Sequence, residues 1–215
     1  MTGRRVLCTA AHGGHLDLFD VTGPALRRYA DAHGYELVVL HERLGRGRPA
    51  AWDKVVLLHA LVRDHDLVVW VDCDALVLDD APDIAGTLQP DRFLHLVEHR
   101  TKNGRVPNTG VLALRGGDRS ARFLEKVWRQ ERFVHDRWWE NAAVNHVLGY
   151  RRVPKAGVQP VVPVGPRAGV GFLDRAWNSI PDDASPRPHI VHFPGTPLVD
   201  RLHALQSHAA ASPAA

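Results

Sequence analysis

Residues 67–78 read LVVWVDCDALVL, an apolar run of five residues, an Asp-Cys-Asp triplet and a second apolar run. An unbroken run of this length, rich in Val, is typical of a strand that is buried on both faces of a sheet. Asp72 and Asp74 follow this strand directly, at its carboxyl end, which is the edge where open α/β sheets bind ligands. We therefore expect the two acids at a ligand site; the alternative is an acidic strand end that faces water.

The segments around this strand alternate between strand-like and helix-like patterns. The expected strands are residues 6–11, 35–40, 92–98 and 111–114, and the expected helices are residues 22–33, 49–63, 120–132 and 139–148. Such alternation is typical of a parallel sheet with helices on its faces. We predict one α/β domain over residues 1–208, with a central, mostly parallel sheet flanked by helices, and a frayed tail over residues 209–215.

Composition excludes several classes of protein. Two cysteines in 215 residues are too few for a disulfide scaffold, so we expect Cys8 and Cys73 to be free thiols in a cytoplasmic protein. No apolar run approaches the roughly 20 residues of a membrane span. The net charge of +3 is small and dispersed, which argues against a nucleic-acid partner. Most of the cationic residues are Arg, which favours a phosphorylated small molecule.

Asp72 and Asp74 have the spacing of a pair that holds one divalent cation. The spacing alone is weak evidence, because Asp64 and Asp66 repeat it in the polar turn before the strand. His192 ends a short alternating strand pattern and is the candidate third ligand, since two Asp and one His suit Mn²⁺. With 14 histidines in the chain, an ordinary hydrogen-bonded residue is the alternative for His192.

Three further motifs carry polar side chains that a ligand site needs. Asn108-Thr109-Gly110 comes at the amino end of the expected strand 111–114, where it either positions a sugar hydroxyl or forms an ordinary turn. Glu140 and Asn141 lie in the first turn of an expected helix, where acids are common because they suit the helix dipole. Lys54 lies in the first turn of another helix, after an Arg-rich loop that either meets phosphate or is solvated.

Taken in order, the motifs resemble those of the retaining α-galactosyl-, α-mannosyl- and α-xylosyltransferases of the yeast and plant Golgi type. The resemblance covers roughly residues 6–196. It rests on Tyr29-Ala30-x-x-His33-Gly34-Tyr35-Glu36, Trp52-x-Lys54, Val69-Trp70-Val71-Asp72-Cys73-Asp74-Ala75-Leu76-Val77, Asn108-Thr109-Gly110, Glu140-Asn141-x-Ala143 and Val191-His192-Phe193-x-Gly195.

The resemblance implies a GT-A, Rossmann-like fold, a Mn²⁺ or Mg²⁺ ion, a nucleotide-sugar donor, with a UDP-sugar favoured, and a small-molecule or glycan acceptor. It assigns the metal to Asp72, Asp74 and His192, and the catalytic roles around the transferred sugar to Asn108, Glu140 and Asn141. The implied donor-binding residues are Thr9, Ala10, Lys54, Asp72, Cys73, Gly110 and Gly195.

The chain departs from the family pattern at three places. Glu140-Asn141 stands where the family usually has Asp-Gln, which leaves the identity of the donor sugar open. The Lys that often follows the Gly195 position is replaced by Thr196-Pro197, so another cation, Lys54 or Arg167, would meet the diphosphate. The N-terminal membrane span of the Golgi enzymes is absent, which indicates a soluble, bacterial-type relative.

Two other functions compete with this interpretation. Phosphohydrolases of the haloacid dehalogenase type also place Asp-x-Asp after an apolar strand, but they expect Thr or Val where Leu76 stands. They also need a later acid pair after a strand, and Asp182-Asp183 follows a Pro instead. A carbohydrate-binding module would keep the fold without needing the metal set Asp72, Asp74 and His192.

Overall fold

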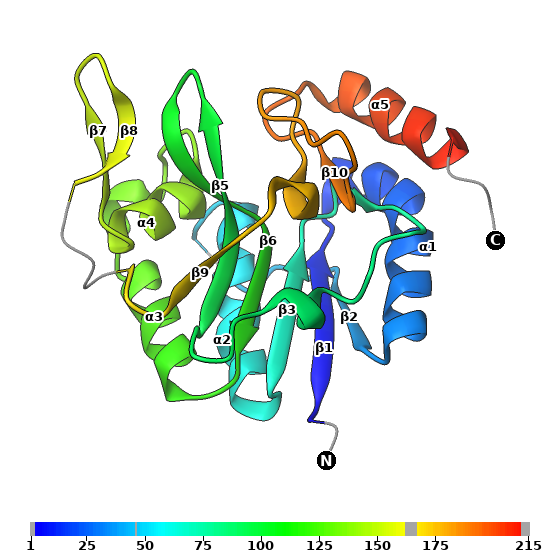
Figure 1. Ribbon diagram of the computed structural model, residues 1–215, viewed down its shortest axis with the longest axis horizontal. Helices are drawn as coiled ribbons and strands as arrows, with labels where there is room; N and C mark the ends of the chain where they lie inside the picture. The colour runs from blue at the N-terminus through cyan, green and yellow to red at the C-terminus, as the bar shows by residue number, and fades with distance from the viewer. Residues whose placement is uncertain (1–2, 46, 162–166, 212–215) are drawn as a thin grey trace.

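The computed structural model describes residues 3–45, 47–161 and 167–211, and within them an eight-stranded sheet runs between two layers of helices (Figure 1). The strands are β1 (Arg5–Ala10), β2 (Glu36–Leu40), β3 (Leu67–Val71), β4 (Ala75–Val77), β5 (Leu94–Thr101), β6 (Gly104–Arg115), β7 (Tyr150–Val153), β8 (Gly157–Pro160), β9 (Val170–Leu173) and β10 (Ile190–His192). The α-helices are α1 (Leu16–His33), α2 (Asp53–Asp64), α3 (Asp118–Trp128), α4 (Trp139–Val147) and α5 (Leu198–Ala211).

The strand order of the main sheet is β2-β1-β3-β6-β5-β9, with β8 attached to β6 and β7 to β8. β1 runs parallel to β2 and β3, and β5 runs parallel to β9, whereas β6 is antiparallel to both β3 and β5. A separate two-stranded sheet pairs β4 with β10. The predicted α/β fold with a central, mostly parallel sheet flanked by helices is therefore confirmed.

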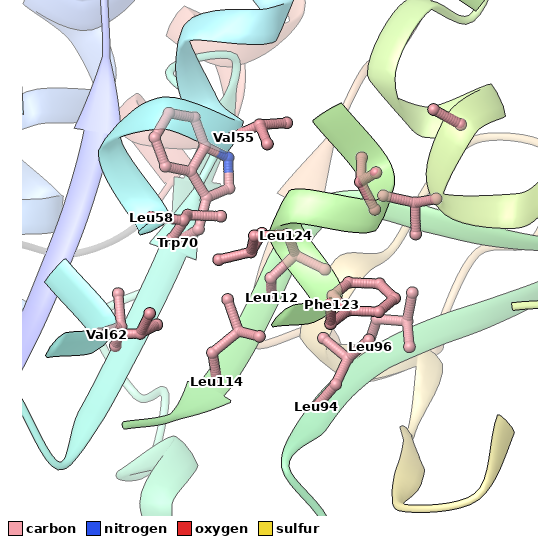
Figure 2. Packing of buried hydrophobic residues seen from close by; sticks show 14 of the residues in the cluster. Val55, Leu58, Val62, Trp70, Leu94, Leu96, Leu112, Leu114, Phe123 and Leu124 are labelled. Carbon is pink, nitrogen blue, oxygen red and sulfur yellow. The ribbon is translucent and has the colours of Figure 1, made fainter. Parts of the chain in front are cut away.

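Side chains of the sheet alternate between two cores, as the two-residue period of a strand requires. Val68 and Trp70 of β3 point to the side covered by α2 and α3. Figure 2 shows this packing with Leu58 and Leu124 from the two helices. Val69 and Val71 point to the opposite side, which α1 covers. Because both faces of β3 are buried, the residues that follow it reach the protein surface only at the carboxyl edge of the sheet.

Helix α1 begins at Leu16, six residues before the start predicted from Thr22 and Pro24. Thr22 is not an N-cap: its hydroxyl donates to the carbonyls of Leu18 and Cys73, at 3.2 and 2.8 Å. Pro24 lies inside the helix. Its missing N–H costs one helical hydrogen bond, and the neighbouring residues Gly23, Ala25 and Leu26 are buried.

The Asn108-Thr109-Gly110 motif lies within β6, and not before a strand as predicted. Leu96 of β5 pairs with Leu112, but the next residue, Val97, pairs with Asn108, so residues 109–111 form a bulge against β5. Bulges bend a strand and re-aim its side chains, often beside functional sites. Pro107 and Gly110, which indicated a turn, are compatible with this interrupted ladder.

Helix α5 packs on α1 at the upper right of Figure 1 and continues to Ala211. Residues 209–211, expected to fray, are therefore helical, and residues 212–215 of the predicted tail lie outside the described residues.

Candidate metal and donor site

The acid turn, residues 72–74, is held by hydrogen bonds from three elements. The Asp72 N–H donates to the Gly110 carbonyl of β6 at 2.8 Å, and the Ala75 N–H closes the turn on the Asp72 carbonyl at 2.9 Å. The Thr22 hydroxyl of α1 donates to the Cys73 carbonyl at 2.8 Å. The two carboxylates therefore project from a fixed backbone at the carboxyl edge of β3.

His192 reaches the acids through the small second sheet. β10 pairs antiparallel with β4 so that His192 lies opposite Ala75, the residue after Asp74. Its Nε2 is 3.3 Å from Asp74 Oδ1 and 3.9 Å from Asp72 Oδ2. One ligand atom from each residue lies within 4.8 Å of the other two. The structure thus brings together the three predicted metal ligands, and among the described residues no other group of His, Cys, Asp or Glu does so.

The donor atoms of the cluster fit a divalent cation, because each carboxylate has one oxygen anchored by protein and one facing His192. Asp72 Oδ1 accepts from Trp70 Nε1 at 2.7 Å, and Asp74 Oδ2 accepts from Arg201 Nη1 at 2.6 Å. Burial by itself would raise the Asp74 pKa, but His192 and Arg201 outweigh it and hold that pKa well below its usual range. The Asp74 carboxylate is therefore anionic at any physiological pH, as binding of a cation would require.

Gly110 is required by the packing of His192. A Cβ at residue 110 would lie 2.3 Å from His192 Cε1, a distance at which the ring has to move. The Gly110 N–H also donates to Asn108 Oδ1 at 2.7 Å. The glycine of the Asn-Thr-Gly motif thus makes room for the imidazole and orients the neighbouring amide.

Lys54 is 5% exposed and neutralises two acids. Its Nζ lies 2.9 Å from Asp72 Oδ1, 2.9 Å from Glu140 Oε1 and 3.1 Å from the Thr109 carbonyl oxygen. Burial would lower the Lys54 pKa, but the two carboxylates raise it above its usual value. The three ammonium hydrogens are thus engaged within the protein, in contrast to the expectation that Lys54 meets a diphosphate.

Thr109, in the bulge of β6, joins the three predicted catalytic residues. Its N–H donates to Asn141 Oδ1 at 2.9 Å and its hydroxyl to Glu140 Oε1 at 3.1 Å, while Asn108 precedes it in the chain. Glu140 is 4% exposed, and its burial raises its pKa despite the opposing effect of Lys54. The structure therefore groups Asn108, Glu140 and Asn141 next to Asp72, through Lys54.

The backbone before Glu140 is strained. Trp139 has φ of 43°, a conformation that bulky residues rarely adopt, and the residue is 47% exposed. Trp139 is the first residue of α4, so this conformation lies directly before Glu140 and Asn141, which contact Thr109 of β6.

The remaining predicted donor-binding residues lie at the same edge of the sheet or in the turn after β10. The pairing of Cys8 with Trp70 places Thr9 and Ala10 level with the end of β3. Within the described chain the buried Thr9 hydroxyl has no hydrogen-bond partner. Gly195 has φ of 71° in the turn after β10.

Cys8 and Cys73 are buried free thiols, as predicted. Burial is the main reason that both pKa values lie above the usual thiol value, which disfavours the reactive thiolate.

Two residues of the site were not predicted. Arg201 of α5 contacts Asp74, whereas Arg167, one of the cations expected at the diphosphate, lies over the Tyr150 ring. Asn178 is fully buried between His192 and Asn108. Neither belongs to a short motif; an Arg three residues into a helix after the Pro-Gly turn is the one signal that points to Arg201.

No helix within the described residues is long and apolar enough to cross a membrane.

The predicted phosphohydrolase alternative finds no support in the acid pair Asp182-Asp183. Asp183 accepts hydrogen bonds from His99 at 3.1 Å and Arg175 at 3.1 Å, and it does not join the metal cluster.

Three solved structures of glycosyltransferases have a similar fold. A glycosyltransferase involved in the glycosylation of the major capsid of PBCV-1 is 15% identical, with a TM-score of 0.69 over 94% of this chain and 99% of that one. The galactosyltransferase LgtC in complex with donor and acceptor sugar analogues is 12% identical, with a TM-score of 0.62 over 97% and 96%. Mouse xyloside xylosyltransferase 1 is 9% identical, with a TM-score of 0.53 over 89% and 98%.

At these identities the likeness shows the fold, of the GT-A type, and no more. No curated protein sequence matches the chain. Residues 49–200, which include β3, the acid turn, the bulge of β6 and His192, match the sequence profile described as Nucleotide-diphospho-sugar transferase. This match covers well over half of the chain, so the protein belongs to the nucleotide-diphospho-sugar transferase family.

Proposed function

We propose that this protein is a metal-dependent, retaining glycosyltransferase that moves a hexose or pentose from a UDP-sugar to a small-molecule or glycan acceptor. The observation that carries the proposal is the convergence of Asp72, Asp74 and His192 beside the buried group around Thr109 in a member of this family. LgtC was solved with donor and acceptor sugar analogues, and another neighbour is a xylosyltransferase, which supports both the reaction and the range of sugars.

Asp72 Oδ2, Asp74 Oδ1 and His192 Nε2 would hold the metal, with Mn²⁺ as first choice because the set mixes two carboxylates with an imidazole. A bound divalent ion would stabilise the negative charge that develops on the leaving diphosphate. The protein keeps this set ready: Lys54, Trp70 and Arg201 fix the far oxygens of the two acids.

Arg201 takes the place of the cation that the family often has after the glycine. Its side chain is partly exposed beside Asp74, and its Nη2 donates to the Thr196 carbonyl at 2.6 Å. A guanidinium in this position suits the planar, two-pronged recognition of phosphate oxygens. Lys54 cannot take this role while its hydrogens are bound to Asp72, Glu140 and Thr109.

Asn108, Glu140 and Asn141 would line the pocket of the transferred sugar. The two amides orient its hydroxyls, and Glu140, being 4% exposed, acts chiefly through its ion pair with Lys54. Thr9, Ala10, Cys73, Gly110 and Gly195 would line the path of the nucleotide. The anomeric carbon passes through an oxocarbenium-like state. The acceptor hydroxyl attacks from the face that the diphosphate leaves, and its proton passes to the departing diphosphate oxygen.

The buried free thiols fit a reducing compartment, so we propose that the protein acts in the cytoplasm.

The proposal is tested by incubating the protein with a panel of UDP- and GDP-sugars and simple glycoside acceptors, and following products by mass spectrometry and by NMR of the anomeric proton. We expect Mn²⁺-dependent transfer or donor hydrolysis with retention, abolished by EDTA and restored by added Mn²⁺. Asp74→Asn should lower the rate by orders of magnitude without loss of fold. Turnover that persists after removal of metal, or an inverted anomeric product, would contradict the proposal.

A further inference from the structure

Asn178, the last residue of the short 3₁₀ helix η6 (Arg175–Asn178), connects the proposed metal ligand His192 to the proposed sugar-pocket residue Asn108. Its Oδ1 lies 2.8 Å from His192 Nδ1, and its Nδ2 lies 2.9 Å from Asn108 Oδ1. The side chain has no solvent exposure, so water cannot replace either partner. Each of these hydrogen bonds is therefore needed to satisfy a buried polar group.

The directions of the hydrogen bonds that link Gly110, Asn108, Asn178 and His192 follow from one backbone amide. The Gly110 N–H can only donate, so the Asn108 atom 2.7 Å away is the acceptor Oδ1. The Asn178 atom facing that oxygen must then be the donor Nδ2, which leaves Oδ1 of Asn178 to face His192. An amide oxygen only accepts, so His192 Nδ1 must carry a hydrogen.

We propose that Asn178 is a positioning residue that keeps a hydrogen on His192 Nδ1, so that Nε2, which faces Asp72 and Asp74, is the ring nitrogen left to bind a metal. The geometry agrees, because Nε2 is the ring nitrogen that faces both carboxylates, at 3.9 and 3.3 Å. A ligand nitrogen has to be free of its proton, and the hydrogen bond at the other ring nitrogen decides which one is free.

The backbone supports this assignment. The His192 N–H donates to the Ser179 carbonyl at 2.9 Å, and the Ser179 N–H donates to the Ile190 carbonyl at 2.8 Å, so the residue after Asn178 is bound to β10 on both sides of Val191. Asp174 holds the start of η6 by accepting from the Ala176 N–H at 2.8 Å. Asn178 is thus fixed relative to His192 by its main chain as well as by its side chain.

The same series of hydrogen bonds determines which group of the Asn108 side chain is left to bind a ligand. Its Oδ1 accepts from both Gly110 and Asn178, so the group left for a ligand is its Nδ2, a donor. Asn178 therefore couples the two halves of the site: it prepares a metal ligand through His192 and a hydrogen-bond donor for the sugar through Asn108. An Asp at residue 178 could serve His192 but could not donate to Asn108, and a Leu of similar size could do neither.

The tautomer of His192 can be tested on the metal-free protein, and this test does not depend on the proposed function. The consequence of the tautomer for metal binding does rest on that function. Two-bond ¹H–¹⁵N correlation spectra of ¹⁵N-histidine-labelled protein, recorded at about pH 9, distinguish the two tautomers. The His192 signals are those missing in His192→Gln. We expect the Nδ1–H form in the wild type, unlike free imidazole side chains, which favour Nε2–H. A ring that carries a hydrogen on Nε2 alone would overturn the inference, whereas a hydrogen on Nδ1, with or without a second one on Nε2 facing Asp74, supports it.

Two variants separate the two bonds. Asn178→Leu should release the Nδ1–H preference and weaken Mn²⁺ binding about 10- to 100-fold, measured by electron paramagnetic resonance of the free ion. Asn178→Asp should keep the Nδ1–H and bind Mn²⁺ within about threefold of wild type, yet transfer sugar more slowly because Asn108 loses its partner. Thermal unfolding shows whether each variant is folded.

Unchanged Mn²⁺ affinity and tautomer in folded Asn178→Leu would overturn the inference, as would loss of the Nδ1–H form in Asn178→Asp. If Asn178→Leu does not fold, the wild-type tautomer and the Asn178→Asp measurements decide. A wild-type protein that shows the Nδ1–H form and binds Mn²⁺ but transfers no sugar would contradict the proposed function alone.

Discussion

Arg201 Nη1 lies 2.6 Å from Asp74 Oδ2, although 127 positions separate the two residues in the chain. The other oxygen of the same carboxylate faces His192 Nε2 at 3.3 Å. One acid therefore stands between a permanent cation and a proposed metal ligand. The contact also ties α5, the last helix, to the acid turn after β3.

Replacing Arg201 with Met should slow sugar transfer without weakening metal binding. Loss of the guanidinium removes a positive charge that opposes a second cation at Asp74, so the Mn²⁺ dissociation constant should fall or stay unchanged. Transfer should slow by about 10- to 1000-fold, because the leaving diphosphate loses a fixed cation. The Mn²⁺ affinity is measured by titration and the transfer rate with the best donor of the panel.

The matched control is Arg28→Met. It removes another Arg–Asp pair, in which Arg28 Nη2 lies 2.8 Å from Asp79 Oδ1 and the Arg28 side chain is largely exposed. Both quantities should stay within about twofold of wild type there. Equal transfer rates for Arg201→Met and wild type would remove Arg201 from the donor site.

Lys54→Met should unfold much more easily than the wild type, because it leaves Asp72 and Glu140 without the cation that they share at 2.9 Å. Breaking a buried ion pair by removing one partner costs about 3–5 kcal/mol. Adding Glu140→Gln to Lys54→Met removes one stranded charge and should restore part of this stability without restoring transfer. Urea unfolding of the wild type, both single variants and the double variant measures the coupling; strictly additive losses would contradict it.

Gly110→Ala should weaken Mn²⁺ binding by about tenfold or more, because the added Cβ would meet the His192 ring at 2.3 Å and displace its Nε2. Stability should fall as well, by about 1–3 kcal/mol for an overpacked interior. Gly86→Ala is the control, since a Cβ there has no neighbour within 4 Å. Wild-type Mn²⁺ affinity in folded Gly110→Ala would show that the position of His192 does not determine binding.

The protein should lose stability as the pH falls from about 6.5, the ordinary histidine pKa, to about 4. Burial, helped by Arg115 and Arg92, lowers the pKa of His95 to about 4, and its Nε2 accepts from the Gln89 N–H at 3.0 Å. The unfolded chain therefore takes up this proton first as the pH falls, which favours unfolding across that window.

His95→Gln should flatten the pH dependence of the unfolding free energy without abolishing it, because burial and nearby arginines also lower the pKa of His146 to about 4. An unchanged slope in urea unfolding between pH 6.5 and 4 would exclude His95 as a contributor.

The position of the acids could be predicted from local sequence, because five apolar residues buried on both faces define a central strand whose carboxyl end carries Asp72 and Asp74. His192 required the family resemblance, since its approach to Asp74 depends on the pairing of two three-residue strands, β4 and β10. Strands this short have no periodicity from which their partner can be inferred.

Asn178 could not be predicted, and Arg201 was indicated only by its place after the Pro-Gly turn, because each meets the site through tertiary packing of a helix whose sequence has no distinctive spacing. The start of α1 and the place of Asn108 were wrong for a related reason. Thr22, Pro24 and Pro107 usually mark the ends of elements, but here burial of α1 and the bulge in β6 outweigh those local preferences.

A crystal structure of the protein with Mn²⁺ and UDP is the most direct test of the proposed metal site. We predict one ion bound by Asp72, Asp74 and His192, with His192 Nε2 roughly 2.0 to 2.4 Å from the ion. The diphosphate should lie within reach of Arg201. An ion bound elsewhere would contradict the proposed site. So would a His192 side chain more than about 6 Å from the ion, because a directly bound ligand lies within a few ångströms of its metal.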